Sequence, residues 1–287
     1  MQSLWTKDKE LEFFTETLKS SSEEQLFYKG EDSRYYAYWP KAYSGKKSTL
    51  QSRNALIGKF TEQYSLDLLE EFAASKGLLA VKGVVCNEIG LTNRSPADVA
   101  ICTSKDKFQR AENIKALFEV KMSIVWNWEL IKGEIRCLGD YTTHKGNPGL
   151  LRSDSMLKAI GKSTYIRVSG HKGSKIPIIV LGNTPITNSY KSKVDHLKKA
   201  GVIQGFWSVN SNPSDYSDSI KNTDEHGFIR MDTYSELMNH LDNLFSNQLE
   251  FFSSMIGKSD LGRIIETASQ HSSYDQKAEI FLSLIRG

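Results

Sequence analysis

Apolar residues recur at helical spacing early in the chain. Between residues 54 and 76 they share one helix face, at Leu56, Phe60, Tyr64 and Leu68. Gly77 follows directly, and glycine readily adopts the left-handed conformation that ends many helices. The pattern therefore predicts an amphipathic helix over residues 54–76.

Short apolar runs bounded by turn-forming or charged residues predict strands. These runs are rich in β-branched and aromatic residues and cover residues 78–86, 97–102, 116–122, 176–182 and 205–209. Helical patterns lie between the later runs, over residues 152–162 and 191–200. Strands separated by helices favour an α/β fold with some parallel pairing.

The other segments have weaker patterns. Residues 132–149 are polar and contain several glycines, and residues 210–227 are rich in Ser, Asn and Asp, which is typical of a surface loop. Apolar residues return at helical spacing within residues 233–285, at Leu237, Leu241, Leu244, Phe281, Leu284 and Ile285. We therefore expect a helical C-terminal appendage.

The composition is that of an ordinary folded protein. Of 287 residues, 39% are hydrophobic and 25% are charged, with a formal net charge of +3. The three cysteines, Cys86, Cys102 and Cys137, are too few and too scattered for a disulfide framework or a zinc site. The first residues lack the apolar run of a signal peptide, and no apolar run is long enough for a bilayer. We expect a cytoplasmic protein with no membrane partner.

Two carboxylates interrupt the predicted strands. Glu119 follows Asp98 by 21 residues, which suits two adjacent strands and their connection. An ionised carboxylate is costly to bury unless it is paired or binds a metal. Because side chains alternate across a strand, Glu119 and Lys121 emerge on one face, and Asp98 converges there if the two strands pair.

This set of groups suits phosphodiester hydrolysis. Carboxylate oxygens bind Mg²⁺, which polarises a phosphate and lowers the pKa of a bound water. A lysine supplies a point charge with three donors for that water or for the developing negative charge. The acidic-x-Lys pattern alone is weakly specific, since it also occurs at Asp275-Gln276-Lys277 in a polar segment. The alternative for the first pattern is a salt-bridged pair on an exposed sheet face.

Pro96-x-Asp98 with Glu119-x-Lys121, preceded by a helix, resembles the PD-(D/E)xK nuclease superfamily and, within it, the type II restriction endonucleases. The resemblance covers about residues 54–209. Ala97 separates Pro96 from Asp98, whereas the short form of the motif has the two adjacent.

The resemblance implies a central mixed β-sheet flanked by helices and Mg²⁺-dependent cleavage of double-stranded DNA, usually by a homodimer. By position, Asp98 and Glu119 would be the metal ligands and Lys121 the catalytic lysine. A companion DNA methyltransferase is also implied by the resemblance alone. Many such nucleases carry a further glutamate on the preceding helix, for which Glu62 is the candidate. A solvated helix face explains Glu62 equally well.

Positive charge is concentrated just after the third strand. Residues 132–175 contain nine Lys or Arg and three acidic residues, a net charge of +6, which predicts a surface for a phosphate backbone. Within it, residues 144–153 have the composition of a DNA-recognition loop, although a surface loop leading to a helix capped by Ser153 or Asp154 is the alternative. Lys158 and Lys162 are expected to contact phosphates. The predicted DNA-binding residues are Lys145, Asn147, Arg152, Ser153, Lys158 and Lys162.

These patterns divide the chain into three parts. Residues 1–53 are an N-terminal extension, residues 54–210 a nuclease core that includes the basic insert 132–175, and residues 211–287 a loop and helical region. The function expected is that of a sequence-specific DNA endonuclease. A structure-specific or repair nuclease of the same superfamily, and a non-catalytic DNA-binding protein with a nuclease-like fold, are the alternatives.

Overall fold

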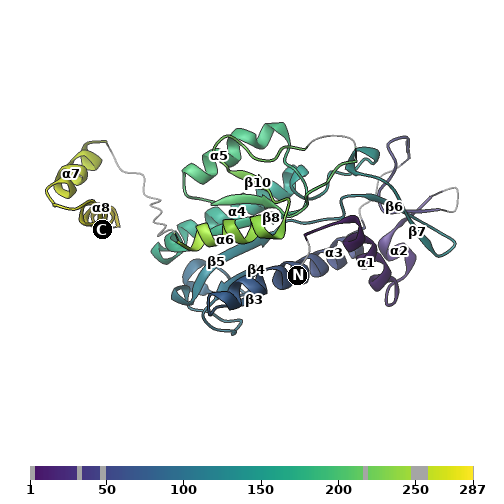
Figure 1. Cartoon of the computed structure of the whole chain (residues 1–287), viewed down its shortest axis with the longest axis horizontal. Coiled ribbons are helices and arrows are strands. Elements are labelled where there is room, and N and C mark those ends of the chain that lie inside the picture. Colours follow the sequence, from purple (N-terminus) through teal and green to yellow (C-terminus); the bar gives the residue numbers. More distant parts are fainter. Residues whose placement is uncertain (1–3, 31–33, 46–49, 216–218, 247–257, 287) are drawn as a thin grey trace.

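A six-stranded mixed β-sheet lies at the centre of the protein (Figure 1). The computed structural model describes residues 4–30, 34–45, 50–215, 219–246 and 258–286. In spatial order the strands are β10 (Phe228–Arg230), β9 (Gly205–Ser208), β8 (Ile178–Gly182), β5 (Ile114–Val120), β4 (Ala97–Cys102) and β3 (Leu79–Val84). The strands β3, β4 and β5 pair antiparallel, whereas β5, β8, β9 and β10 pair parallel. The predicted α/β class with a mixed, helix-flanked central sheet is confirmed.

Helices cover both faces of this sheet. On one face, α3 (Gln51–Ser75) packs Leu68 and Phe72 into the same cluster as Val99 and Phe118 of the sheet. α6 (Tyr234–Ser246) adds its apolar side to that cluster. On the other face lie α4 (Ser153–Val168) and α5 (Lys191–Lys199), which pack against alternate residues of the same strands. The two faces therefore follow the alternation of side chains along each strand.

A second, four-stranded antiparallel sheet adjoins the first. Its order is β1 (Tyr28–Lys29), β2 (Tyr35–Tyr36), β6 (Asn127–Ile131) and β7 (Glu134–Gly139). The polar segment predicted over residues 132–149 therefore begins as a hairpin strand. Lys132 and Gly133 form its turn with φ angles of 50° and 81°, as a two-residue hairpin turn requires. A lysine at such a position is not a turn signal, so the sequence pattern does not predict this hairpin.

Before β1, the described part of the N-terminal segment contains the helices α1 (Lys7–Leu18) and α2 (Glu23–Leu26). Trp5, Phe13 and Phe14 are fully buried in the principal core cluster, and the Trp5 amide donates to Val209 O at 2.8 Å. The described part of this segment is thus packed into the body of the protein.

The helical C-terminal region is confirmed. After α6, the structure has α7 (Lys258–Ser269) and α8 (Tyr274–Arg286), which pack against each other (Figure 1). Among the described residues, no helix has the length and apolar content that crossing a membrane demands.

Candidate active site

Asp98 and Glu119 lie where β4 and β5 separate. The last paired residues are Val99 and Phe118, and both side chains point towards α3. Asp98 and Glu119 are their immediate neighbours along each strand, so both carboxylates point to the opposite face, where α4 lies. The predicted convergence of the two carboxylates is therefore what the structure shows.

The Asp98 carboxylate accepts a hydrogen bond from a backbone amide of β5 that has no backbone acceptor on β4. The Lys121 amide donates to Leu181 O of β8, so the preceding amide, that of Val120, points towards β4. It donates to Asp98 Oδ2 at 2.7 Å. The side chain thus satisfies an amide that the separating strands leave without a ladder partner, and the bond fixes Asp98 beside Glu119.

Two lysines bridge the carboxylates. Lys121 Nζ lies 2.6 Å from Glu119 Oε1 and 3.9 Å from Asp98 Oδ2. Lys162 Nζ, from α4, lies 2.5 Å from Glu119 Oε2 and 3.6 Å from Asp98 Oδ1. It also donates to Pro96 O at 2.7 Å. Each ammonium therefore lies within 4 Å of both carboxylates. The site is a compact cluster of two carboxylates and two lysine ammonium groups.

Burial makes the ionisation of this cluster unusual. Desolvation, followed by the nearby charge of Glu119, raises the pKa of Asp98 to about 6, against the opposing effect of Lys162 and Lys121. Burial lowers the pKa of Lys162, but the charges of Asp98 and Glu119 outweigh it and raise that pKa overall. Shifts of this kind, produced by burial together with specific charge partners, are typical of functional sites.

Lys162 was predicted to contact a DNA phosphate, but the structure places it elsewhere. Its side chain is only 17% exposed and turns inward to Glu119. The sequence pattern could not show this, because it depends on how α4 crosses the sheet. The sequence shows only that Lys162 lies one helical turn after Lys158, so that both lysines share one side of α4. It does not show which part of the protein that side faces.

Glu62 does not join the cluster. It forms an ion pair with Lys82 at 3.3 Å. Lys82 lies opposite Val99 in the sheet, and residues directly opposite each other share a face. Val99 packs towards α3, so Glu62 lies on the face opposite to Asp98 and Glu119. Of the two explanations for Glu62, the geometry favours an ordinary helix-surface ion pair.

The donor set fits a magnesium ion. Within the described ranges, no group of three or more His, Cys, Asp or Glu side chains gathers as a metal site. Mg²⁺ is commonly held by one or two carboxylates together with water and substrate phosphate, so a larger group is not required. Asp98 and Glu119 supply hard oxygen donors on one face, and Lys162 lies within 4 Å of both.

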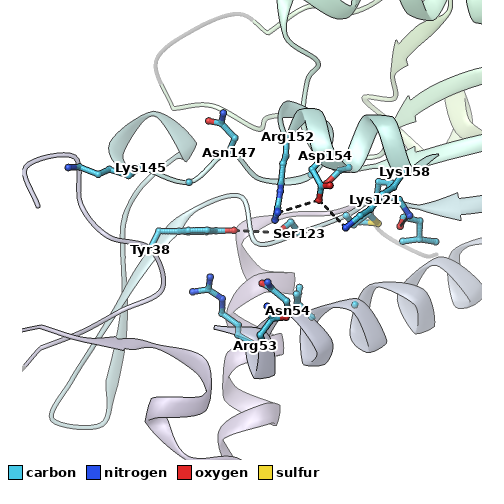
Figure 2. A pocket seen from close by; sticks show the side chains of 18 of the residues that line it. Tyr38, Arg53, Asn54, Lys121, Ser123, Lys145, Asn147, Arg152, Asp154 and Lys158 are labelled. Atoms are coloured by element: carbon cyan, nitrogen blue, oxygen red, sulfur yellow. Dashed lines mark hydrogen bonds and ion pairs between the residues drawn. The ribbon is translucent and has the colours of Figure 1, made fainter. Parts of the chain in front are cut away.

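A pocket of about 730 Å³ opens beside Lys121. Figure 2 shows Arg53 and Asn54 of α3 on one side of it, and Asn147 and Arg152 on the other. Its charged lining consists of five cations and one acid: Arg53, Lys121, Lys145, Arg152, Lys158 and Asp154. The excess of cations favours a polyanionic ligand.

Four of the predicted DNA-binding residues line this pocket: Lys145, Asn147, Arg152 and Lys158. Arg152 and Lys158 both pair with Asp154, at 3.3 and 3.0 Å (Figure 2). The Lys145 ammonium donates to Tyr43 O. Ser153 is exposed and is the first residue of α4, whereas the N-cap is Arg152, without a side-chain cap bond. The predicted cap at Ser153 or Asp154 is therefore wrong, whereas the choice between a recognition loop and an ordinary surface loop stays a prediction.

Comparison of the chain with family models, curated proteins and solved structures finds no match. The resemblance to PD-(D/E)xK nucleases therefore depends on the short motifs and on the geometry of Asp98, Glu119 and Lys121.

Proposed function

We propose that this protein is a Mg²⁺-dependent, sequence-specific endonuclease that cleaves double-stranded DNA, with a restriction-endonuclease-like core. The observation that carries the proposal is the meeting of Asp98, Glu119 and Lys121 on one face of neighbouring strands, beside a cation-lined pocket. Neither part alone would suffice, since ion pairs and basic clefts are both common.

Each residue has a chemical task in this proposal. Asp98 and Glu119 would hold the ion, which when bound supplies charge stabilisation and a more acidic water. Lys121 lines the pocket and contacts the carboxylates, so its ammonium can hold the negative charge that develops on a phosphate placed there. Lys162 keeps Glu119 oriented from the α4 side.

The DNA would lie in the pocket. Arg152 and Lys158 suit phosphate contacts, and Asn147 on the loop before α4 can pair with an adenine edge. Cutting both strands of a duplex calls for two such sites, so the proposal includes a homodimer. A cognate methyltransferase remains part of the proposal only through the restriction-enzyme resemblance.

Incubation of the purified protein with phage DNA and Mg²⁺, followed by gel electrophoresis, tests the proposal. Discrete fragments are expected. Asp98→Asn and Lys121→Met should each reduce cleavage at least about thousandfold, because each removes a group that acts on the transition state. Both should still bind duplex DNA with Ca²⁺ in place of Mg²⁺. Asp275→Asn is the matched control, because it alters the other acidic-x-Lys pattern.

The other outcomes are equally informative. Cleavage confined to branched DNA would identify a structure-specific nuclease. Binding without any cleavage would identify a non-catalytic DNA-binding protein. Near-normal cleavage by Asp98→Asn or Lys121→Met would remove this site assignment.

A further inference from the structure

Arg53 lies inside a ladder of aromatic rings at the pocket. Its guanidinium carbon is 5.2 Å from the ring centre of Tyr28 and 4.7 Å from that of Tyr38. The ladder continues on both sides, because Tyr28 stacks on Trp39 at 4.9 Å and Tyr38 stacks on His144 at 4.0 Å. The rings hold Arg53 by its faces, so only its N–H edge is free to meet a ligand.

That edge has an unmet hydrogen bond. Arg53 is 3% exposed, and its Nη1 has no hydrogen-bond partner among the described residues. Burying a charged donor without an acceptor is strongly unfavourable. Arg53 lines the pocket, so the side chain that carries this unpaired donor lies beside the space in which an acceptor could bind.

The start of α3 provides a second, independent indication. Leu50 at its N-cap makes no side-chain cap bond, and its first turn contains no acidic residue. Gln51, Arg53 and Asn54 of that turn all line the pocket. A helix N-terminus carries partial positive charge, so a buried cation in its first turn is electrostatically unfavourable. An anion in the pocket would relieve both costs.

We propose that Arg53 and the first turn of α3 bind a phosphoryl group. A tetrahedral anion with several acceptors matches a guanidinium edge together with helix N–H groups. A nucleobase is disfavoured, because the rings of the ladder are occupied by one another and by Arg53. The phosphoryl group is that of a DNA strand lying in the pocket, separate from the one cleaved beside Lys121. The assignment to DNA rests on the proposed function, whereas the phosphoryl site does not.

Calorimetric titration of the full-length chain with inorganic phosphate tests the site. Wild type should bind, and Arg53→Gln should lose binding. Arg53→Lys should bind at least about tenfold more weakly, because a lysine keeps the charge but not the planar edge. Wild type without phosphate binding, or Arg53 variants that bind as wild type does, would overturn the proposal.

Arg53 is packed in the core, so an exposed variant guards against loss of folding. Gln51→Glu places a carboxylate in the exposed first turn, where it should preserve or raise Tm and yet weaken phosphate binding at least about tenfold. Ala55→Glu is the matched control, since Ala55 is exposed on the same helix but does not line the pocket. Equal phosphate binding by Gln51→Glu and Ala55→Glu would contradict the site.

The same variants separate this proposal from the nuclease proposal. Duplex binding in Ca²⁺ should weaken in Gln51→Glu and not in Ala55→Glu. Phosphate binding that depends on Arg53, in a protein that cuts no DNA, would keep the phosphoryl site and remove the nuclease function. DNA cleavage and duplex binding unaffected by Gln51→Glu would keep the nuclease and remove the assignment of the bound phosphoryl group to DNA.

Discussion

Unlike an ordinary surface lysine, Lys162 is largely buried and lies against the carboxylates of Asp98 and Glu119. Its ammonium neutralises charge between Asp98 and Glu119, and it does so from a different element than the strands that carry them. Burial and the nearby charge of Glu119 raise the pKa of Asp98, and the charge of Lys162 opposes that rise. Lys162 is therefore a positioning residue for Glu119 and an electrostatic support for Asp98.

Replacing Lys162 by methionine tests that role. We expect kcat/KM for cleavage to fall about a hundredfold, because Glu119 loses its second anchor. The acid side of the pH profile should also move to higher pH, since Lys162 lowers the pKa of Asp98. Lys172→Met is the matched control, because Lys172 is an exposed lysine that pairs with Glu88 and does not line the pocket. Cleavage by Lys162→Met within about threefold of wild type would contradict the role.

His144 gives a prediction on pH. Its Nδ1 accepts from the Gly146 amide at 3.1 Å, so its proton lies on Nε2, which is 3.3 Å from Val125 O. Burial, with a smaller effect of Arg53, lowers its pKa to about 4 from the usual 6.5. The unfolded chain takes up a proton near pH 6.5, whereas the folded chain resists it. The resulting stability is complete above pH 6.5 and is lost as the pH falls towards 4.

Urea unfolding between pH 4 and pH 8 measures this effect. The shift corresponds to about 3 kcal/mol across the window. In His144→Gln the loss of unfolding free energy between pH 6.5 and pH 4 should be smaller by about that amount. Identical pH profiles for the two proteins would show that His144 is not held neutral.

At the scale of elements, the sequence patterns located the regular parts of the core. β4 has the predicted bounds, because an apolar run interrupted only by Asp98 lies between a proline-containing turn and polar residues and allows few alternatives. The helix predicted over residues 54–76 begins three residues earlier, at Gln51. β10 contains only three residues and carries no periodicity, so it could not be found. The hairpin of β6 and β7 is not predicted by the sequence, because its turn at Lys132 and Gly133 has an atypical composition.

The candidate site was predictable only where it depends on local geometry. Glu119 and Lys121 share a face because of strand alternation, which sequence shows directly. Lys162 and Arg53 act through the packing of helices on the sheet, which no short-range pattern encodes. The two explanations of Glu62 stay equally open in the sequence for the same reason, since an amphipathic pattern does not tell which side of the sheet a helix covers.

A buried carboxylate, together with the contact between Phe14 and Trp128, joins α1 to β6. Glu10 is fully buried and accepts hydrogen bonds from Trp5 Nε1 at 3.0 Å and from Trp128 Nε1 at 2.9 Å. It also accepts from the amides of Val125 at 2.6 Å and Trp126 at 3.1 Å. Four donors meet two oxygens, so the N-terminal segment is joined to the core by a satisfied polar network.

Glu10→Gln should destabilise the protein by about 3 kcal/mol, because the amide NH₂ faces donors and leaves buried N–H groups without acceptors. The free energy of unfolding in urea is the measurement. Glu12→Gln on the exposed side of α1 is the control and should change it by less than about 0.5 kcal/mol. A Glu10→Gln protein as stable as wild type would show that α1 is not held by this carboxylate.

At the scale of the whole molecule, the C-terminal helices are set apart from the sheet (Figure 1). α7 and α8 bury Ala268, Leu282 and Ile285. They leave Ile265 49% and Leu284 42% exposed. Both helices are strongly amphipathic, and two helices alone bury little apolar surface. A further apolar surface is needed to cover the pair, and the proposed cleavage of both DNA strands would call for a second copy of the chain.

We therefore predict that the α7–α8 pair of one chain packs on that of a second chain. Light scattering after size exclusion should give a dimer for the full chain and a monomer for a chain ending at Ser246. Ile265→Asp in the full chain should also give a monomer, while Asp275→Asn, on the polar side, should not. Because Asp98, Glu119 and Lys121 of the proposed active site all come from one chain, the monomers should still nick one strand while double-strand cutting falls at least about tenfold. A chain ending at Ser246 that remains dimeric would place the dimer contact elsewhere, on the body that carries the sheet.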